Sequence, residues 1–168
     1  MTHINFDNID NVLEIGGGSG HFPILINHYH NNIKTYIDVD IPETIIFNIC
    51  FIMYFFPEKK FLLPNEVNEK NIYDYNFVYF TPEQINLIKN DTIDLSLNST
   101  SFGEMNKKDI SIYFDLIQRS SKNNAYFFNY NRVLKNPEGQ DEEKNKNLEP
   151  NIFADYPYKQ NEILIYDI

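Results

Sequence analysis

Short apolar runs alternate along this chain with longer segments whose apolar residues recur at helical spacing. The short runs predict the main strands, at residues 11–15, 34–40, 77–80, 93–97 and 125–130. The segments between them predict helices, at residues 22–29, 42–56, 81–88 and 106–120. Strands that alternate with helices form parallel sheets with right-handed crossovers. The pattern therefore predicts a Rossmann-like, doubly wound α/β fold with a mostly parallel sheet, in one domain over residues 1–168.

Weaker signals lie outside this alternation. The apolar run 61–63 predicts a short extra strand that pairs with the main sheet. Residues 135–150 are polar, with acids and lysines at their centre, and predict a solvated loop. Residues 162–166 predict a last strand.

The turn after the first strand carries the most informative chemistry. The sequence V-L-E-I-G-G-G-S-G places Glu14 at the end of the strand, just before a group of glycines. The glycines fit the pattern G-x-G-x-G, at Gly16, Gly18 and Gly20. They do not fit the dinucleotide pattern G-x-G-x-x-G, because its third glycine would fall at His21. A turn without side chains lets a ligand approach backbone N–H groups.

Two acids indicate which ligand suits this turn. Glu14 would repel a pyrophosphate but attract a cationic group, and Asp40 ends the second strand, where it can accept hydrogen bonds from a ribose diol. S-adenosylmethionine carries a sulfonium, an ammonium and a ribose diol, and no phosphate. Asp38, two residues before Asp40, is interpreted as an ordinary solvated strand residue. A flexible turn with solvated acids remains the alternative interpretation.

Three segments together resemble a known family. They are V-L-E-I-G-G-G-S-G-H-F, Y-I-D-V-D-I-P-E and I-D-L-S-L-N-S-T-S-F-G-E-M. In this order, within residues 12–132, they are similar to the class I S-adenosylmethionine-dependent methyltransferases, and most similar to the bacterial sugar O-methyltransferases. The resemblance implies a class I methyltransferase core that uses S-adenosylmethionine to methylate a sugar hydroxyl of a glycan or nucleotide sugar. Family members have helices before the glycine motif and a longer strand hairpin at the end. We therefore expect the chain to lack the N-terminal cap and part of the C-terminal hairpin.

The resemblance and the strand ends together give a set of candidate site residues. Those expected to bind the cofactor are Glu14, Gly16, Gly17, Gly18, Gly20, Asp40, Asn98 and Ser99. Glu104 or His21 is the candidate catalytic base, although an acid or a histidine at a helix start is also common without such a role. Tyr130 and Arg132 are candidate substrate-binding residues, and a plain surface arginine is the alternative for Arg132.

Composition and charge limit which kinds of partner, metal site and cellular compartment are expected. The formal net charge is −10, which disfavours a nucleic acid as substrate. His28 and His30 lie two residues apart and point to different faces of a helix, so we expect no metal site there. Cys50 is the one cysteine, which leaves no internal disulfide, and its apolar neighbours suggest a buried thiol. Together with the polar N-terminal residues, which do not resemble a signal peptide, this makes the cytosol the expected compartment.

The predicted helix at residues 42–56 is apolar on almost every side. Its apolar run, residues 45–56, is too short to span a bilayer, which needs about 20 residues. One face is expected to pack on the sheet, while the other needs a cover. A second subunit or a chain segment that is missing here is favoured over a cover from within this chain.

Two other functions stay open at this point. A non-catalytic module with the same fold could bind the cofactor or a partner without transferring a methyl group. A nicotinamide-dependent oxidoreductase is a weaker alternative, because the dinucleotide pattern is incomplete.

Overall fold

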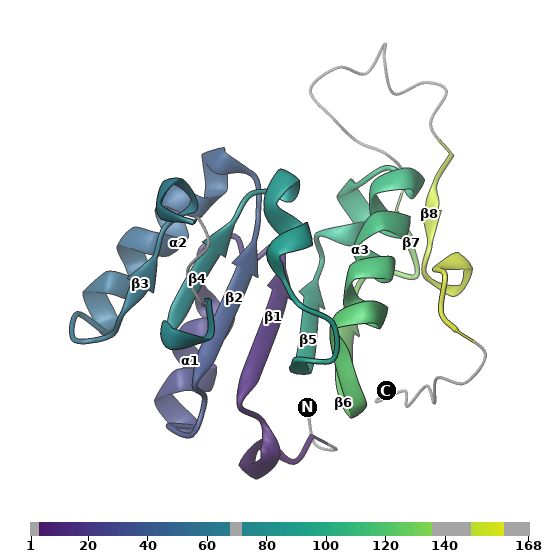
Figure 1. Ribbon diagram of the computed structural model, residues 1–168. Coiled ribbons are helices and arrows are strands. Elements are labelled where there is room, and N and C mark those ends of the chain that lie inside the picture. Colours follow the sequence, from purple (N-terminus) through teal and green to yellow (C-terminus); the bar gives the residue numbers. More distant parts are fainter. Residues whose placement is uncertain (1–3, 68–71, 136–148, 160–168) are drawn as a thin grey trace.

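Parallel strands alone form the main sheet in the part of the chain that the structure describes. This computed structural model describes residues 4–67, 72–135 and 149–159. The strands of the main sheet are β1 (Asn11–Ile15), β2 (Thr35–Val39), β3 (Phe61–Leu62), β4 (Phe77–Phe80), β5 (Ile93–Ser99) and β6 (Ser121–Tyr130). They lie in the order β3-β4-β2-β1-β5-β6 (Figure 1). The predicted parallel sheet and the predicted Rossmann-like fold are confirmed.

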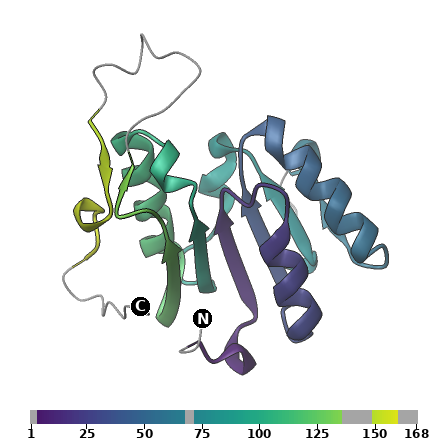
Figure 2. The same ribbon diagram turned by 180° about the vertical axis from the view of Figure 1, so that it is seen from behind.

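Helices cover both faces of this sheet. The α-helices are α1 (His21–Tyr29), α2 (Pro42–Phe55) and α3 (Lys107–Ser120). α3 lies over the face seen in Figure 1, and α1 and α2 lie over the opposite face, which Figure 2 brings to the front. Short 3₁₀ helices complete the connections: η1 (Phe6–Asn8), η2 (Pro64–Glu66), η3 (Ile72–Asp74), η4 (Pro82–Leu87), η5 (Phe102–Glu104) and η6 (Phe153–Asp155).

The alternation of side chains along each strand divides the core in two. On β1, Val12 packs in the cluster that contains Ile26 of α1 and Ile49 of α2. Leu13 and Ile15 belong to the other cluster, which holds the buried face of α3. The interiors of β1, β2 and β4 are therefore buried on both sides, as is usual for a parallel sheet covered by helices, whereas the edge strand β6 is only partly buried.

Local sequence signals explain where the helices begin. Asn106 precedes α3, and its Oδ1 accepts a hydrogen bond from the Asp109 N–H at 3.0 Å. α2 begins with Pro42, whose missing N–H is not needed in a first turn. α1 follows Gly20, which adopts a left-handed conformation that suits a residue without a side chain.

Several predicted bounds differ from those in the structure. The segment after Thr81 forms the 3₁₀ helix η4 rather than an α-helix, although the Thr81 N–H does donate to Gln84 Oε1 at 3.0 Å. The extra strand at 61–63 is confirmed as β3, which pairs with β4. Lys135 lies in β7 (Leu134–Lys135), which pairs antiparallel with β8 (Asn151–Ile152), so the predicted loop begins one residue too early.

Two other predictions fall outside the described residues. They are the rest of the loop, over 136–148, and the strand at 162–166. Among the residues that the structure does describe, no helix combines the length and the apolar character needed to cross a membrane.

α2 presents an apolar outer face. Its inner residues Ile45, Asn48, Ile49 and Ile52 are buried against the sheet and α1. The exposed large apolar side chains of α2 are Ile46, Phe47, Phe51, Met53, Tyr54 and Phe55. Cys50 is also exposed, so the prediction of a buried thiol is wrong. The thiol follows the outward side of the helix, and apolar neighbours in sequence do not indicate on which side of a helix a residue lies.

Candidate cofactor and acceptor site

The strand order places a crevice at the carboxyl ends of β1 and β5. The chain leaves β1 toward α1 on one face of the sheet and leaves β5 toward α3 on the other face. In open α/β sheets, ligands bind at the point where successive connections diverge in this way. The glycine turn follows β1 and the N-S-T-S segment follows β5, so both lie at this edge.

The glycine turn depends on backbone angles that other residues avoid. Gly16, Gly18 and Gly20 have φ angles of 74°, 56° and 83°. The Gly16 N–H donates to the Val39 carbonyl at 2.8 Å, which ties the turn to β2. An L-residue pays roughly 1–2 kcal/mol for each such left-handed position, so the glycines are needed for conformation as well as for access.

The turn is enclosed on two sides and open at Gly18. A Cβ on Gly16 would lie 2.4 Å from Ser101 Oγ, and a Cβ on Gly17 would lie 2.5 Å from Asp38 Oδ1. A Cβ on Gly18 would meet nothing within 4 Å. Gly18 is therefore the residue at which the turn faces free space.

Asp40 holds its position through backbone contacts. Its Oδ2 accepts a hydrogen bond from the Gly18 N–H at 2.9 Å, and its Oδ1 accepts one from the Ile41 N–H at 2.7 Å. The side chain is half-buried at the end of β2. A carboxylate has about four acceptor positions, so two remain for a ligand.

Glu14 is more deeply buried than a solvated strand-end acid. It is 2% exposed, and its Oε2 accepts a hydrogen bond from the Tyr36 hydroxyl at 2.8 Å. Burial raises the pKa of Glu14 to about 7, the Tyr36 hydrogen bond opposes this rise, and repulsion by Asp40 adds to it. Glu14 therefore titrates close to neutral pH, next to the glycine turn.

Asp38 corrects the sequence interpretation. It is 1% exposed instead of solvated, its Oδ1 accepts from the Gly17 N–H at 3.1 Å, and its Oδ2 accepts from Asn48 Nδ2 at 2.9 Å. Burial, then repulsion by Glu14 and Asp40, raises the pKa of Asp38 well above its usual range. An interior strand of a sheet covered on both faces buries every side chain, polar ones included, and that consequence of the predicted fold could have corrected the interpretation.

The end of β5 is fixed by side-chain amides. Asn98 is buried, and its Nδ2 donates to the Ile15 carbonyl at 2.9 Å and also to Ser101 Oγ. Its Oδ1 accepts from Asn131 Nδ2 at 2.7 Å. Ser99 is half-buried at the edge of the sheet. Ser101 and Asn131 are not among the site residues predicted from the sequence, where the only signal for them is the group of polar residues after β5 and β6.

Thr100 adds a strained position at the same edge. Its φ angle is 66°, which is unusual for a β-branched residue, and its N–H donates to the Tyr130 carbonyl at 2.7 Å. Strained backbone of this kind persists where surrounding contacts enforce it, and it is frequent at functional sites.

The candidate catalytic and acceptor residues are exposed around this edge. Glu104 ends η5 and His21 begins α1, and the His21 Nδ1 lies 2.7 Å from Ser19 Oγ. Tyr130 ends β6, and Arg132 follows it on the surface. The fold thus brings these residues to the same edge of the sheet. Within the described part of the chain, no group of three or more His, Cys, Asp or Glu residues is arranged to hold a metal ion.

Comparisons with known proteins find structural matches only. No described protein family and no curated protein matches the sequence. The PH0226 protein from Pyrococcus horikoshii OT3 is similar with a TM-score of 0.54 and 16% identity, over 76% of this chain and 52% of that chain. The mitomycin 7-O-methyltransferase MmcR gives 0.51 and 12% identity, over 82% and 34%. The protein PigF, solved with S-adenosylhomocysteine, gives 0.50 and 14% identity, over 81% and 38%.

These likenesses define the fold. The chain has the Rossmann-like fold of a class I methyltransferase, with a six-stranded parallel sheet in the described residues. It spans from about a third to about half of the length of these solved chains.

Proposed function

We propose that this chain is the core of an S-adenosylmethionine-dependent O-methyltransferase whose acceptor is a sugar hydroxyl in a glycan or a nucleotide sugar. One observation carries the cofactor assignment. The glycine turn is packed against side chains at Gly16 and Gly17 but open at Gly18, beside Asp40 and the buried Glu14. This is a space for a small ligand bordered by acidic side chains, and it suits a cationic nucleoside better than a pyrophosphate.

The cofactor-binding residues take distinct parts in this proposal. Asp40 accepts hydrogen bonds from the ribose hydroxyls with the acceptor positions that its backbone contacts leave unused. Glu14 is almost inaccessible and its pKa is raised to about 7, so it acts on the ammonium and sulfonium groups through the charge of its ionised form, which a bound cation favours. Asn98 already bonds to Ile15, Ser101 and Asn131, so it shapes the strand end, and Ser99 next to it makes the contact with the ligand.

The reaction asks the protein mainly for positioning. When bound, the cofactor supplies a methyl group that bonds to the acceptor oxygen as its bond to sulfur breaks, with the electron pair left on sulfur. The chain must hold the acceptor oxygen in line with that bond. Glu104 or His21 takes the proton that the hydroxyl loses, and Tyr130 and Arg132 hold the sugar. The name of MmcR, a 7-O-methyltransferase, supports transfer to oxygen. The assignment of a sugar as the acceptor rests on the sequence resemblance alone.

Two measurements, made one after the other, test the proposal. Titration calorimetry should detect S-adenosylhomocysteine binding to the wild-type chain, unchanged in a Lys34→Ala control at the far end of the sheet and lost in Asp40→Ala. Methyl transfer from labelled S-adenosylmethionine to a set of nucleotide sugars should then fall at least about tenfold in Glu104→Gln or in His21→Ala, whichever residue is the base. Binding of NADH in place of S-adenosylhomocysteine would support an oxidoreductase and contradict the proposal.

A non-catalytic binding module is the second candidate function. The observation that favours it is the exposure of both candidate bases, Glu104 and His21, on a chain that spans only part of its structural matches. A catalytic site usually excludes water from the reacting atoms. Tight binding of S-adenosylhomocysteine without transfer to any sugar acceptor would support this candidate.

We also propose that the outer face of α2 binds a second copy of this chain. Within residues 44–56 there is no charged side chain, whereas Glu43 precedes this stretch and Glu58, Lys59 and Lys60 follow it. Two antiparallel copies of α2 would bring Glu43 of each copy close to residues 58–60 of the other, which carry a net positive charge. Light scattering should report a dimer, and Phe47→Glu, which places a charge at a 68% exposed apolar position, should yield a monomer. A wild-type chain that stays monomeric at high concentration would exclude this partner and leave a different protein segment as the cover.

The compartment of the protein is a separate part of the proposal. The chain's single cysteine fits a reducing compartment such as the cytosol.

A further inference from the structure

α2 contributes a buried polar side chain to the glycine turn. Asn48 is 0% exposed, and it lies on the inner face of a helix that is otherwise apolar there. Its Nδ2 donates to Asp38 Oδ2 at 2.9 Å, and its Oδ1 accepts from the Tyr79 hydroxyl at 3.2 Å. The second oxygen of Asp38 accepts from the Gly17 N–H at 3.1 Å. A continuous series of hydrogen bonds therefore runs from β4 through α2 and β2 to the turn.

Asn48 also contacts the turn by packing. A Cβ on Gly17 would lie 2.9 Å from Asn48 Nδ2, and a Cβ on Gly20 would lie 3.0 Å from Asn48 Oδ1. The same side chain therefore fits against both ends of the segment that contains Gly18. Because these glycines leave no free space toward α2, a shift of Asn48 must move the turn.

We infer that Asn48 is a positioning residue for the cofactor: by holding Asp38 in place it fixes the Gly17 N–H, and with it the neighbouring Gly18 that faces the ligand space. This inference rests on the proposed function, since it assigns a role within the same cofactor site. Asn48 does not touch the ligand space itself. Its effect passes through Asp38 and the backbone of the turn.

The chemistry of the three side chains explains why an amide is needed. Both oxygens of Asp38 accept hydrogen bonds here, and the Tyr79 hydroxyl donates, so the residue between them must offer one donor and one acceptor. An apolar residue of the same size would leave the Asp38 Oδ2 and the Tyr79 hydroxyl buried without a partner. Each unsatisfied group of this kind is costly.

An exchange of the two side chains gives a matched test. The double variant Asp38→Asn/Asn48→Asp keeps every hydrogen bond in the series. The new amide at position 38 would accept from the Gly17 N–H and donate to the new carboxylate at position 48, and that carboxylate would accept from the Tyr79 hydroxyl. Asn48→Leu keeps the volume but removes the donor and the acceptor. Tyr79→Phe removes only the outermost hydrogen bond.

The affinity of each variant for S-adenosylhomocysteine can be measured by calorimetry at a temperature where all variants are folded. It should depend on how many hydrogen bonds of the series the variant keeps. We expect Asn48→Leu to bind about tenfold or more weakly, Tyr79→Phe to change affinity by less than about threefold, and the exchanged pair to bind within about threefold of wild type. A role limited to stability would lower the melting temperature of Asn48→Leu without weakening binding.

Hydrogen exchange of the Gly17 amide separates this inference from the proposed function. Protection of that amide should be high in the wild type and in the exchanged pair, and low in Asn48→Leu, whether or not the chain binds the cofactor. Absence of binding in the wild type, with this pattern of protection intact, would contradict the proposed function alone. Equal protection of Gly17 in Asn48→Leu and wild type, or an exchanged pair as defective as Asn48→Leu, would overturn the inference.

Discussion

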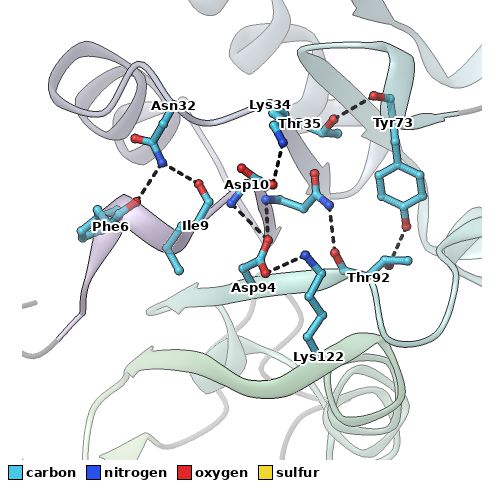
Figure 3. Close-up of polar contacts among 11 residues, drawn as sticks. Phe6, Ile9, Asp10, Asn32, Lys34, Thr35, Tyr73, Thr92, Asp94 and Lys122 are labelled. Atoms are coloured by element: carbon cyan, nitrogen blue, oxygen red, sulfur yellow. Dashed lines mark hydrogen bonds and ion pairs between the residues drawn. The ribbon is translucent and has the colours of Figure 1, made fainter.

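Buried and half-buried carboxyl groups have different partners at the two ends of the main sheet. At the amino ends of the strands, Asp94 accepts hydrogen bonds from the Asp10 N–H at 3.1 Å and from Lys122 Nζ at 2.7 Å (Figure 3). It also accepts one from the Asn11 N–H at 2.9 Å. Asp10 nearby pairs with Lys34 at 2.8 Å. Each of these carboxylates thus has a cation beside it. Asp91 and Asn124, near this end of the sheet, have positive φ angles of 53° and 64°, but Asp and Asn tolerate the left-handed region better than most residues do.

At the carboxyl ends, the acids have no such partner. Within the described residues the ion pairs are Lys34–Asp10, Lys107–Glu149 and Lys122–Asp94, and none of them involves Glu14, Asp38 or Asp40. The same edge holds the glycines and Thr100 with positive φ angles. Burying a carboxyl group without a cation beside it lowers stability, because desolvation penalises its charged form. The concentration of such acids beside the open glycine turn indicates that this edge is shaped for a ligand, and that the other serves the fold.

The largest expected effect tests the enclosed side of the turn. Gly17→Ala should weaken cofactor binding by about 100-fold or more, because the new methyl would overlap Asp38 and Asn48. The same overlap should lower the free energy of unfolding by about 1–3 kcal/mol. Gly18→Ala is the matched control. Its methyl enters open space, so the free energy of unfolding should fall by only about 1 kcal/mol, the cost of the left-handed backbone. Cofactor affinity should also fall, because the methyl occupies the ligand space.

Calorimetry and urea unfolding of both variants check this contrast. If Gly17→Ala bound S-adenosylhomocysteine like the wild type, the turn would not be the ligand-binding element. The distinction between the two ends of the sheet would then lose its main support.

The second effect concerns the pH dependence of stability. The pKa of Glu14 is about 7 in the folded protein and 4.5 ordinarily, so the folded state holds this proton more tightly than the unfolded chain does. The wild type should therefore lose about 3 kcal/mol relative to Glu14→Gln as the pH rises from 4.5 to 7, with no further change above or below this window. Urea unfolding of both proteins across this range measures the difference. A difference that does not vary with pH would mean that burial of Glu14 is compensated by another charge.

The sequence predicted the fold because the fold depends on periodicity. Apolar runs separated by helical spacing define β1 to β6 and the order of the helices, and the glycine motif locates the ligand edge. The finer contacts depend on which residues meet in space. Nothing near Asn48 in the sequence indicates that it bonds to Asp38, which is ten residues away, or that it packs on Gly17.

Burial accounts for two of the interpretations that the structure overturns. Asp38 is polar but lies inside a doubly covered sheet, and Cys50 has apolar neighbours but lies on the outer side of α2. In both cases the residue type suggested one environment and the position in the fold determined another. The expected contacts of Glu104, His21, Tyr130 and Arg132 with an acceptor remain predictions.

A third and smaller effect should appear at the amino ends of the strands. Asp94→Ala removes an acceptor from two backbone N–H groups and from Lys122, and should lower the free energy of unfolding by about 2 kcal/mol. The affinity for S-adenosylhomocysteine should stay within about twofold, because Asp94 lies at the opposite end of β5 from the site. Asp94→Asn, which keeps one acceptor oxygen, should lose less. A large loss of affinity in Asp94→Ala at full folding would contradict the division of roles.

The smallest effect concerns the exposed pair Lys34–Asp10. The two side chains are 68% and 43% exposed, so solvent screens the attraction, and Lys34→Met should change the free energy of unfolding by less than about 1 kcal/mol. Added salt distinguishes this pair from Asp94. Screening at about 1 M salt should remove the effect of Lys34→Met, whereas most of the Asp94→Ala loss should persist because its backbone hydrogen bonds are directional and half-buried. If Lys34→Met cost as much as Asp94→Ala, long-range charge balance rather than local hydrogen bonding would stabilise this end of the sheet.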